Sequence, residues 1–202
     1  EDISEKAIGA IIVSEDWSFY SHQGYDFGEI KDAMISTLTF QRIRGASTIS
    51  QQLAKQLFHG EGSKNIAERL IQKIKEWIIA VRLERQYTKE EIIAQYFNIY
   101  DFGNNADGIR SAARIYFGKE PKELTVKESA MLVGMFKNSS LYNPRPDKNP
   151  VGVKNRRNVV LAQMTKHPKG QFVAVATIDG EEVVVGTAVT MRSHYSPDYE
   201  PL

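Results

Sequence analysis

The chain has 202 residues, of which 42% are hydrophobic and 25% charged, a composition typical of a globular domain and not of a disordered segment. Lys and Arg number 26 against 25 for Asp and Glu, so the overall charge does not indicate a nucleic-acid partner. Without cysteine, the chain can have no disulfide, thiol nucleophile or thiolate metal site. No apolar run reaches the roughly 20 residues of a membrane-spanning helix, and the sequence, which has no initiator Met or signal peptide, reads as a piece of a longer protein.

Apolar residues recur at helical spacing through most of the first 165 residues, which predicts a mainly α domain over residues 1–168. The Pro- and Asn-rich stretch 141–150 is expected to be a loop. Residues 169–202 are expected to be a tail, because β-branched residues at 172–191, split by Asp179-Gly180, predict a short β-hairpin that could begin an interdomain linker. The expected helices cover about residues 4–13, 27–38, 64–86, 88–99 and 153–165, and two more begin at 47 or 48 and at 125.

Hydroxyl side chains mark three of these helix starts. Ser47 or Thr48 can serve as an N-cap. Thr88 with Glu91 has the capping-box pattern, and the sequence TVKE at 125–128 repeats it. The longest helix has an apolar stripe that is expected to face the core, formed by Ile66, Leu70, Ile74, Trp77 and Val81.

The stretch SEDWSFYSHQG, residues 14–24, places titratable side chains among aromatic ones. A carboxylate that is walled in by rings loses hydration, which makes Glu15 a candidate for proton transfer. Asp16 and His22 could hold Glu15 or a substrate hydroxyl by hydrogen bonds. The alternative is a helix end whose acids are exposed and whose aromatic residues pack inward.

A second polar cluster lies at the helix start in GASTISQQLAKQ. Small, hydroxyl and amide side chains followed by a lysine suit an anionic or sugar-bearing ligand. The alternative is an amphipathic helix with a polar outer face and with Leu53 and Leu57 inside. The candidate residues of this cluster are Ser47, Thr48, Gln51, Gln52 and Lys55.

Two further groups of charges could serve the same ligand. Lys73 and Glu76 are three residues apart on a helix and share a face, so Lys73 could hold a phosphate beside a second carboxylate. A surface ion pair is the alternative. Arg156 and Arg157 lie either on the solvated edge of an amphipathic helix or at another phosphate contact. No His-based metal site is predicted, because His59 and His167 have no acidic or histidine partner at ligand spacing.

In this order the groups resemble the five motifs of one family, the peptidoglycan glycosyltransferase domain (glycosyltransferase family 51) of class A penicillin-binding proteins and monofunctional transglycosylases. The first two motifs, E-D-x-x-F-x-x-H-x-G and G-x-S-T-x-x-Q-Q, are met in full. The third has Gln72 in place of an arginine, and the fourth has Phe97 in place of a leucine, next to Asn98. The motifs lie at residues 15–24, 45–52, 72–76, 96–103 and 156–161.

The resemblance implies a lysozyme-like, mainly α, two-lobed fold with a cleft, and lipid II as the substrate. Glu15 would be the general base on the 4-hydroxyl of the acceptor sugar, which attacks C1 of the donor with inversion and expels the lipid diphosphate. Glu76, the second catalytic residue, would orient the cations or hold a divalent ion, Mg or Mn, although no cofactor is required by the sequence. The implied substrate-binding residues are Asp16, His22, Ser47, Thr48, Gln51, Gln52, Lys55, Lys73, Asn98, Arg156 and Arg157.

The implied partners are lipid II, the growing glycan strand, the membrane surface and a transpeptidase domain in the same full-length chain, with no nucleic acid. The implied location is the outer, periplasmic face of the cytoplasmic membrane, with an anchor that this chain lacks. Residues 25–45 would form an interfacial segment, or else pack as an ordinary amphipathic helix.

Three other functions are compatible with the same residues. A lytic transglycosylase or muramidase would use Glu15 as a general acid and would not need the lysines. An inactive module that binds lipid II or glycan would follow if Gln72 reflects lost activity. The third is a scaffold for cell-wall synthases.

Overall fold

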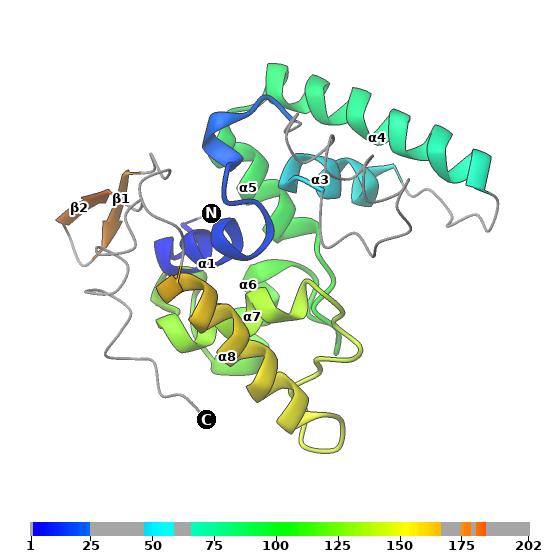
Figure 1. Cartoon of the computed structure of the whole chain (residues 1–202). Helices are drawn as coiled ribbons and strands as arrows, with labels where there is room; N and C mark the ends of the chain where they lie inside the picture. Colours follow the sequence, from blue (N-terminus) through cyan, green and yellow to red (C-terminus); the bar gives the residue numbers. More distant parts are fainter. Residues whose placement is uncertain (1, 25–46, 59–65, 167–174, 179–180, 185–202) are drawn as a thin grey trace. The chain divides into compact units, whose positions relative to one another are not determined.

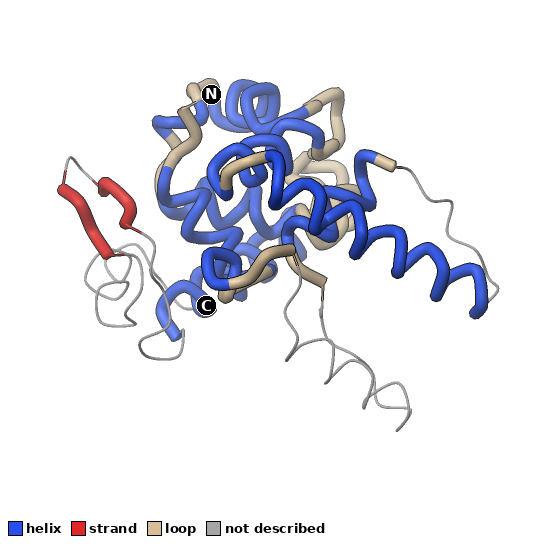
Figure 2. The backbone as a smooth tube through the Cα atoms, turned by 90° about the horizontal axis from the view of Figure 1, so that it is seen from above, coloured by secondary structure: helices blue, strands red, loops and turns tan. Residues whose placement is uncertain are grey.

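The computed structural model describes residues 2–24, 47–58, 66–166, 175–178 and 181–184 (Figure 1). The chain divides into two compact units, residues 1–20 with 97–202 (the first unit) and residues 21–96 (the second unit). Helices make up most of the described part, so the predicted mainly α fold is confirmed (Figure 2). The helix predicted at 27–38 and the rest of segment 25–45 lie outside the described residues.

Three helices build the core of the first unit: α1 (Glu5–Glu15), α7 (Val126–Met135) and α8 (Pro150–Lys166). α1 packs against both α7 and α8, which also pack against each other. Each Ile or Leu side chain that is fully buried in such a core contributes about 1.5–3 kcal/mol. The packing against α7 and α8 therefore fixes the position of α1, whose last residue is Glu15. Buried side chains of these helices include Ala7, Ala10, Ile11, Ile12, Leu132, Val133, Val160, Leu161 and Met164.

An aromatic cluster of the first unit begins in the last turn of α5 (Lys89–Ile99), at Phe97. The ring of Tyr100 stacks on that of Phe136, with the centroids 4.1 Å apart. Phe97 and Phe102 meet the same ring edge to face, at 5.4 and 5.3 Å. These are favourable ring geometries, and they tie the chain after α5 to the end of α7.

The second unit is built on α3 (Ile49–Leu57), which packs against α4 (Ile66–Gln86). Ala80 and Leu83 of α4 are buried, whereas Ile74 is 43% exposed. The predicted core-facing stripe is therefore wrong at Ile74. A helical repeat identifies the residues that share a face, but their burial depends on which elements cover that face.

Three predicted helix caps are confirmed. Thr48 is the N-cap of α3, and its Oγ1 accepts a hydrogen bond from the Gln51 amide at 3.2 Å. Thr88 and Glu91 bond reciprocally at the start of α5. The same capping box, formed by Thr125 with Glu128, begins α7. A hydroxyl at the N-cap satisfies amides that the helix itself leaves without acceptors.

Two features of the first unit differ from the sequence expectation. The helix α6 (Gly108–Phe117) was not predicted; Asp107 is its N-cap and Gly118, in the left-handed region, is its C-cap. α8 begins at Pro150, not at 153. Proline suits the first turn of a helix, because its fixed φ is helical and its missing N–H has no intrahelical acceptor there.

The remaining elements are short. The 3-10 helix η1 (Phe19–Ser21) follows α1 in the sequence, and the 3-10 helix η2 (Pro121–Glu123) precedes α7. β1 (Val175–Ile178) and β2 (Glu181–Val184) pair antiparallel, with Ile178 opposite Glu181. Asp179 and Gly180, the predicted turn, lie outside the described residues, and the division at 168 stays a prediction.

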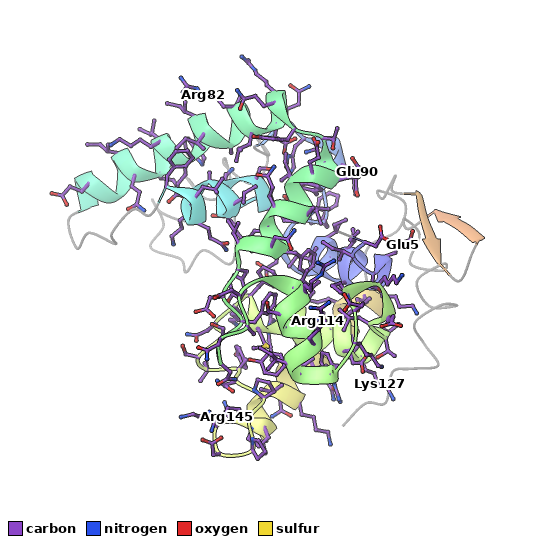
Figure 3. The ribbon with its side chains drawn as sticks, turned by 180° about the vertical axis from the view of Figure 1, so that it is seen from behind. Glu5, Arg82, Glu90, Arg114, Lys127 and Arg145 are labelled. Carbon is purple, nitrogen blue, oxygen red and sulfur yellow. The ribbon has the colours of Figure 1, made fainter. Side chains whose placement is uncertain are left out.

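Charged side chains such as Arg82, Glu90 and Arg114 are exposed on the surfaces of their units (Figure 3). Within the described ranges, no helix has the length and apolar character needed to cross a bilayer.

Candidate active site

Glu15 is the last residue of α1, and its carboxylate meets an arginine of α8. Nη2 of Arg156 lies 3.7 Å from Oε1 of Glu15, with 11% and 21% of the two side chains exposed. Nε of Arg156 also points to the carbonyl of Gly134 in α7, at 3.4 Å. The sequence predicted both residues as site residues but did not predict that they form a pair. An adjacent cation favours the ionised form of a carboxylate.

Tyr100 adds a second polar group to this part of the first unit. Its hydroxyl donates to the carbonyl of Met135 at 2.7 Å. Burial raises the pKa of Tyr100 above 10.0, and the negative charges of Asp101 and Glu15 raise it further, against the opposing effect of hydrogen bonds with Ser139. The phenol therefore stays protonated at neutral pH, within the electrostatic reach of the Glu15 carboxylate.

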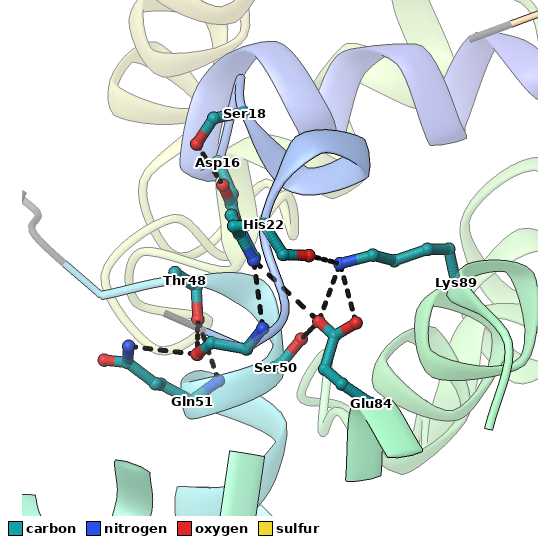
Figure 4. A network of polar contacts seen from close by, with 9 residues as sticks. Asp16, Ser18, His22, Thr48, Ser50, Gln51, Glu84 and Lys89 are labelled. Atoms are coloured by element: carbon teal, nitrogen blue, oxygen red, sulfur yellow. Dashed lines mark hydrogen bonds and ion pairs between the residues drawn. The ribbon is translucent and has the colours of Figure 1, made fainter. Parts of the chain in front are cut away.

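Asp16 and the aromatic residues after it differ in exposure. Asp16 is buried, follows the last helical residue, and receives the Ser18 hydroxyl on Oδ1 at 3.4 Å (Figure 4). Phe19 is fully buried, whereas Trp17 is exposed. The expectation that the aromatic residues pack inward thus holds for Phe19 and fails for Trp17.

In the second unit, a lysine, a hydroxyl and a carboxylate from two helix regions meet. Nζ of Lys73 donates to Oγ of Ser47 at 2.9 Å and to Oε2 of Glu76 at 3.1 Å. Gln72 donates to the other oxygen of Glu76 at 3.4 Å. The Lys73–Glu76 contact within α4 follows from their spacing, whereas the contact with Ser47 does not. We call Ser47, Lys73 and Glu76 the lysine cluster.

The amide side chains of α3 support the same unit. Gln52 donates to the Ser47 carbonyl at 3.1 Å and accepts from the Tyr96 hydroxyl at 2.6 Å. Gln51 donates to the Gly24 carbonyl at 3.2 Å and Thr48 does so at 3.0 Å. These groups are therefore engaged with the protein's own backbone and side chains.

His22 shapes a tight turn in the first motif. Its Nδ1 accepts the backbone N–H of Gly24 at 3.1 Å (Figure 4). The same nitrogen lies 3.9 Å from Oε1 of Glu84. His22 holds the backbone of residues 22–24, and the predicted bond to a substrate hydroxyl remains a prediction.

The remaining predicted residues are more scattered. Lys55, on α3, and Asn98, near the end of α5, are exposed. Arg157 does not join the Glu15–Arg156 pair through any of its described bonds; its guanidinium donates to Asn158 at 2.8 and 3.0 Å. In the described part of the chain, no three Asp, Glu or His side chains are grouped so that they could hold a metal ion.

Sequence reasoning missed a buried ion pair in the second unit. Both oxygens of Glu84 accept from Nζ of Lys89, at 2.7 and 2.8 Å, and Ser50 donates to the same carboxylate (Figure 4). Their spacing of five residues crosses the break between α4 and α5, so no helical periodicity relates them. No sequence signal pointed to this pair.

Comparison with known proteins identifies the family. The family model described as transglycosylase matches residues 1–165. Penicillin-binding protein 1F of Bacillus subtilis (strain 168) is 35% identical over 195 residues, which cover 95% of this chain and 26% of that protein. Penicillin-binding protein 1A of Escherichia coli (strain K12) is 37% identical over 165 residues, covering 81% of this chain and 19% of that protein. The chain spans about a quarter of the length of the first relative and less of the second.

The chain belongs to the transglycosylase family. The predicted resemblance to the glycosyltransferase domain of penicillin-binding proteins is thereby confirmed, and with it the predicted class of enzyme, a peptidoglycan glycosyltransferase.

Proposed function

We propose that this domain polymerises lipid II into glycan strands by an inverting transfer. The Glu15 carboxylate takes the proton of the acceptor's 4-hydroxyl, and that oxygen forms a bond to C1 of the donor sugar. The bond between C1 and the diphosphate oxygen breaks, and undecaprenyl diphosphate leaves as an anion. The reaction follows the logic of inverting glycosidases, with a sugar hydroxyl in place of water.

The Arg156–Glu15 pair is the observation that carries the choice of mechanism. A general base must be ionised before the reaction, whereas a general acid must be protonated. A guanidinium 3.7 Å from a mostly buried carboxylate favours the ionised form. The pair therefore supports Glu15 as a base and disfavours the lytic transglycosylase or muramidase, in which Glu15 would have to donate a proton.

The lysine cluster supports a diphosphate leaving group. Lys73 is held by Ser47 and Glu76, so its ammonium is oriented before a ligand binds, and fixed cations stabilise charge that develops on a leaving group. We assign Lys73 and the exposed Lys55 to the diphosphate. Arg156, held at Glu15, is assigned to the base and not to the diphosphate.

A divalent ion at the diphosphate is a further part of the proposal. Mg²⁺ is commonly bound by one or two carboxylates together with substrate phosphates. Glu76 offers one carboxylate, which fits such a site only when the substrate supplies the remaining oxygens. The ion would add positive charge next to Lys73 at the leaving group.

We also propose that the domain belongs to a longer penicillin-binding protein with a transpeptidase domain. The relatives carry that name, and this chain covers about a quarter of their length or less. The lipid-linked substrate implies that the domain works at the outer face of the cytoplasmic membrane.

Labelled lipid II in detergent tests the function, with products resolved by length. We expect long strands from the unaltered chain and none from Glu15→Gln. Digestion of purified sacculi is the counter-test, because release of muropeptides would establish the lytic function. A folded, unaltered chain that binds lipid II without turnover would establish the binding module.

A further inference from the structure

The ion pair of Glu84 and Lys89 lies at the meeting point of four segments of the second unit. Only 5% of the Glu84 side chain and 17% of the Lys89 side chain is exposed. Glu84 lies near the end of α4, Lys89 is the first residue of α5, and Ser50 of α3 donates to Glu84. The fourth segment is the turn at residues 22–24.

Lys89 links this pair to the turn. Its Nζ donates to the carbonyl of His22 at 2.7 Å, in addition to both oxygens of Glu84 (Figure 4). His22 in turn accepts the N–H of Gly24. The Gly24 carbonyl receives Thr48 and Gln51 from the start of α3. A continuous series of hydrogen bonds therefore runs from the ion pair to the second sequence motif.

Position 24 of the turn accepts only glycine. Its φ is +89°, which disfavours any residue with a side chain. A Cβ at this position would lie 2.9 Å from the backbone carbon of Ala80 in α4. The turn therefore lies close to the backbone of α4, and it is also bonded to Lys89.

We propose that Glu84 and Lys89 are positioning residues, which hold the 22–24 turn and the start of α3 in the geometry that transfer requires. This inference rests on the proposed function. Nζ of Lys89 already donates to both oxygens of Glu84 and to the His22 carbonyl, so the pair is engaged within the protein and acts through the Lys89 bond to the His22 carbonyl.

The charge-swapped variant Glu84→Lys/Lys89→Glu separates positioning of the turn from stabilisation of the fold. It restores an ion pair but removes the donor to the His22 carbonyl. We expect the swap to recover most of the melting temperature lost in Lys89→Met. We expect kcat for lipid II polymerisation to stay reduced, on the order of 10²-fold, with KM little changed. Recovery of kcat together with stability would overturn the proposal.

Hydrogen exchange at the Gly24 amide tests, without an activity assay, whether the Glu84–Lys89 pair holds the 22–24 turn in place. In the swap, this amide should exchange about tenfold faster or more than in the unaltered chain. Lys119→Met is the matched control, because it removes a lysine from another ion pair, with Glu128 at 2.8 Å, and should change neither kcat nor Gly24 exchange.

A measurement on the unaltered chain covers the case in which the swap does not fold. Gly24 and Ile92, whose amide donates to Thr88 within α5, should exchange through the same opening event. Much faster exchange at Gly24 than at Ile92 would show that the turn opens independently of α5. It would refute the proposal that the Glu84–Lys89 pair holds the turn. If the unaltered chain fails to polymerise lipid II, the proposed function fails. The exchange data would still show whether the Glu84–Lys89 pair holds the 22–24 turn.

Discussion

Arg156 is held beside Glu15 by the packing of α8 on α7. Its Cγ lies 3.0 Å from the position that a Cβ would take at Gly134, so a side chain there would push the arginine away. Its Nε points to the Gly134 carbonyl at 3.4 Å, and its Nη2 lies 3.7 Å from the Glu15 carboxylate. Glycine at position 134 therefore gives Arg156 the room to reach the end of α1.

Removal of the Arg156 charge should move the pH dependence of polymerisation. In Arg156→Met the ionised form of Glu15 loses its cation, so the acidic limb of kcat/KM against pH should shift upward. Arg156→Lys should shift it less. Arg110→Met, at an exposed arginine paired with Glu120, is the control and should leave the limb in place. An unshifted acidic limb in Arg156→Met would show that Arg156 does not affect the ionisation of Glu15.

Lys73→Met should lower the rate of transfer far more than it lowers the binding of lipid II. The ammonium is needed most when the diphosphate leaves, and removal of one oriented donor from a developing anion typically costs about 10²–10³ in kcat. Lys75→Met is a close control, because Lys75 is an exposed lysine two residues along the same helix. Equal losses in both variants, measured with labelled lipid II, would mean that only the total charge of α4 matters.

Gln72→Arg should restore the cation that the third motif has in the family. The Gln72 side chain already reaches Glu76 at 3.4 Å, so an arginine there would bring its charge to the lysine cluster. We expect a several-fold gain in affinity for lipid II that weakens as salt rises. A salt-independent affinity, or none gained, would show that position 72 does not face the diphosphate.

How much of this site could be predicted depended on the distance over which its contacts act. The Lys73–Glu76 contact and the caps at Thr48, Thr88 and Thr125 are local, so spacing on a helix was sufficient. Such patterns use only the geometry of one helix turn.

Contacts between distant segments were not predictable in this way. Arg156 with Glu15 and Lys89 with His22 join segments far apart in the sequence, and their pairing depends on how helices pack. The resemblance supplied the residues without their partners, so it implied a substrate contact for Arg156 and did not reveal the contact with Glu15. Ile74 shows the same limit, since its helical repeat did not reveal that it is exposed.

The stability of the first unit should fall in acid partly because of Glu128. Burial alone raises the pKa of this group, but the bonds from Lys119 and Thr125 outweigh it and hold the pKa below 4.5. A carboxyl whose pKa is lowered in the folded state contributes its full stabilisation above its ordinary pKa. That stabilisation is lost as the pH falls through the lowered value. We therefore expect the unfolding free energy, measured with urea, to fall more between about pH 7 and about pH 3.5 for the unaltered chain than for Glu128→Gln.

The same measurements at the two pH values would contradict this prediction if Glu128 does not contribute to the pH dependence of stability. Glu128→Gln would then lose as much stability in acid as the unaltered chain does. Thr125→Ala is a useful companion, because it removes one partner of the Glu128 carboxylate and leaves Lys119 in place. It should show an intermediate dependence on pH.

Gly108→Ala should disturb the fourth motif, whereas Gly118→Ala should not. Both glycines have positive φ, +76° and +66°, so each substitution carries a similar backbone cost of about 1–2 kcal/mol. Around Gly118 an added Cβ meets no atom within 4 Å. At Gly108 it would lie 2.7 Å from the backbone oxygen of Asn98 and would force the end of α5 to move.

Comparison of these two glycines isolates the effect of the close approach from that of φ. We expect Gly108→Ala to lose about 3 kcal/mol of unfolding free energy and Gly118→Ala about half of that, measured by urea unfolding. Polymerisation by folded Gly108→Ala should also fall, because Asn98 lies at the displaced end of α5, while Gly118→Ala keeps full activity. Equal stability and activity in the two variants would mean that the Gly108 contact relaxes without moving Asn98, and the fourth motif would then not depend on this glycine.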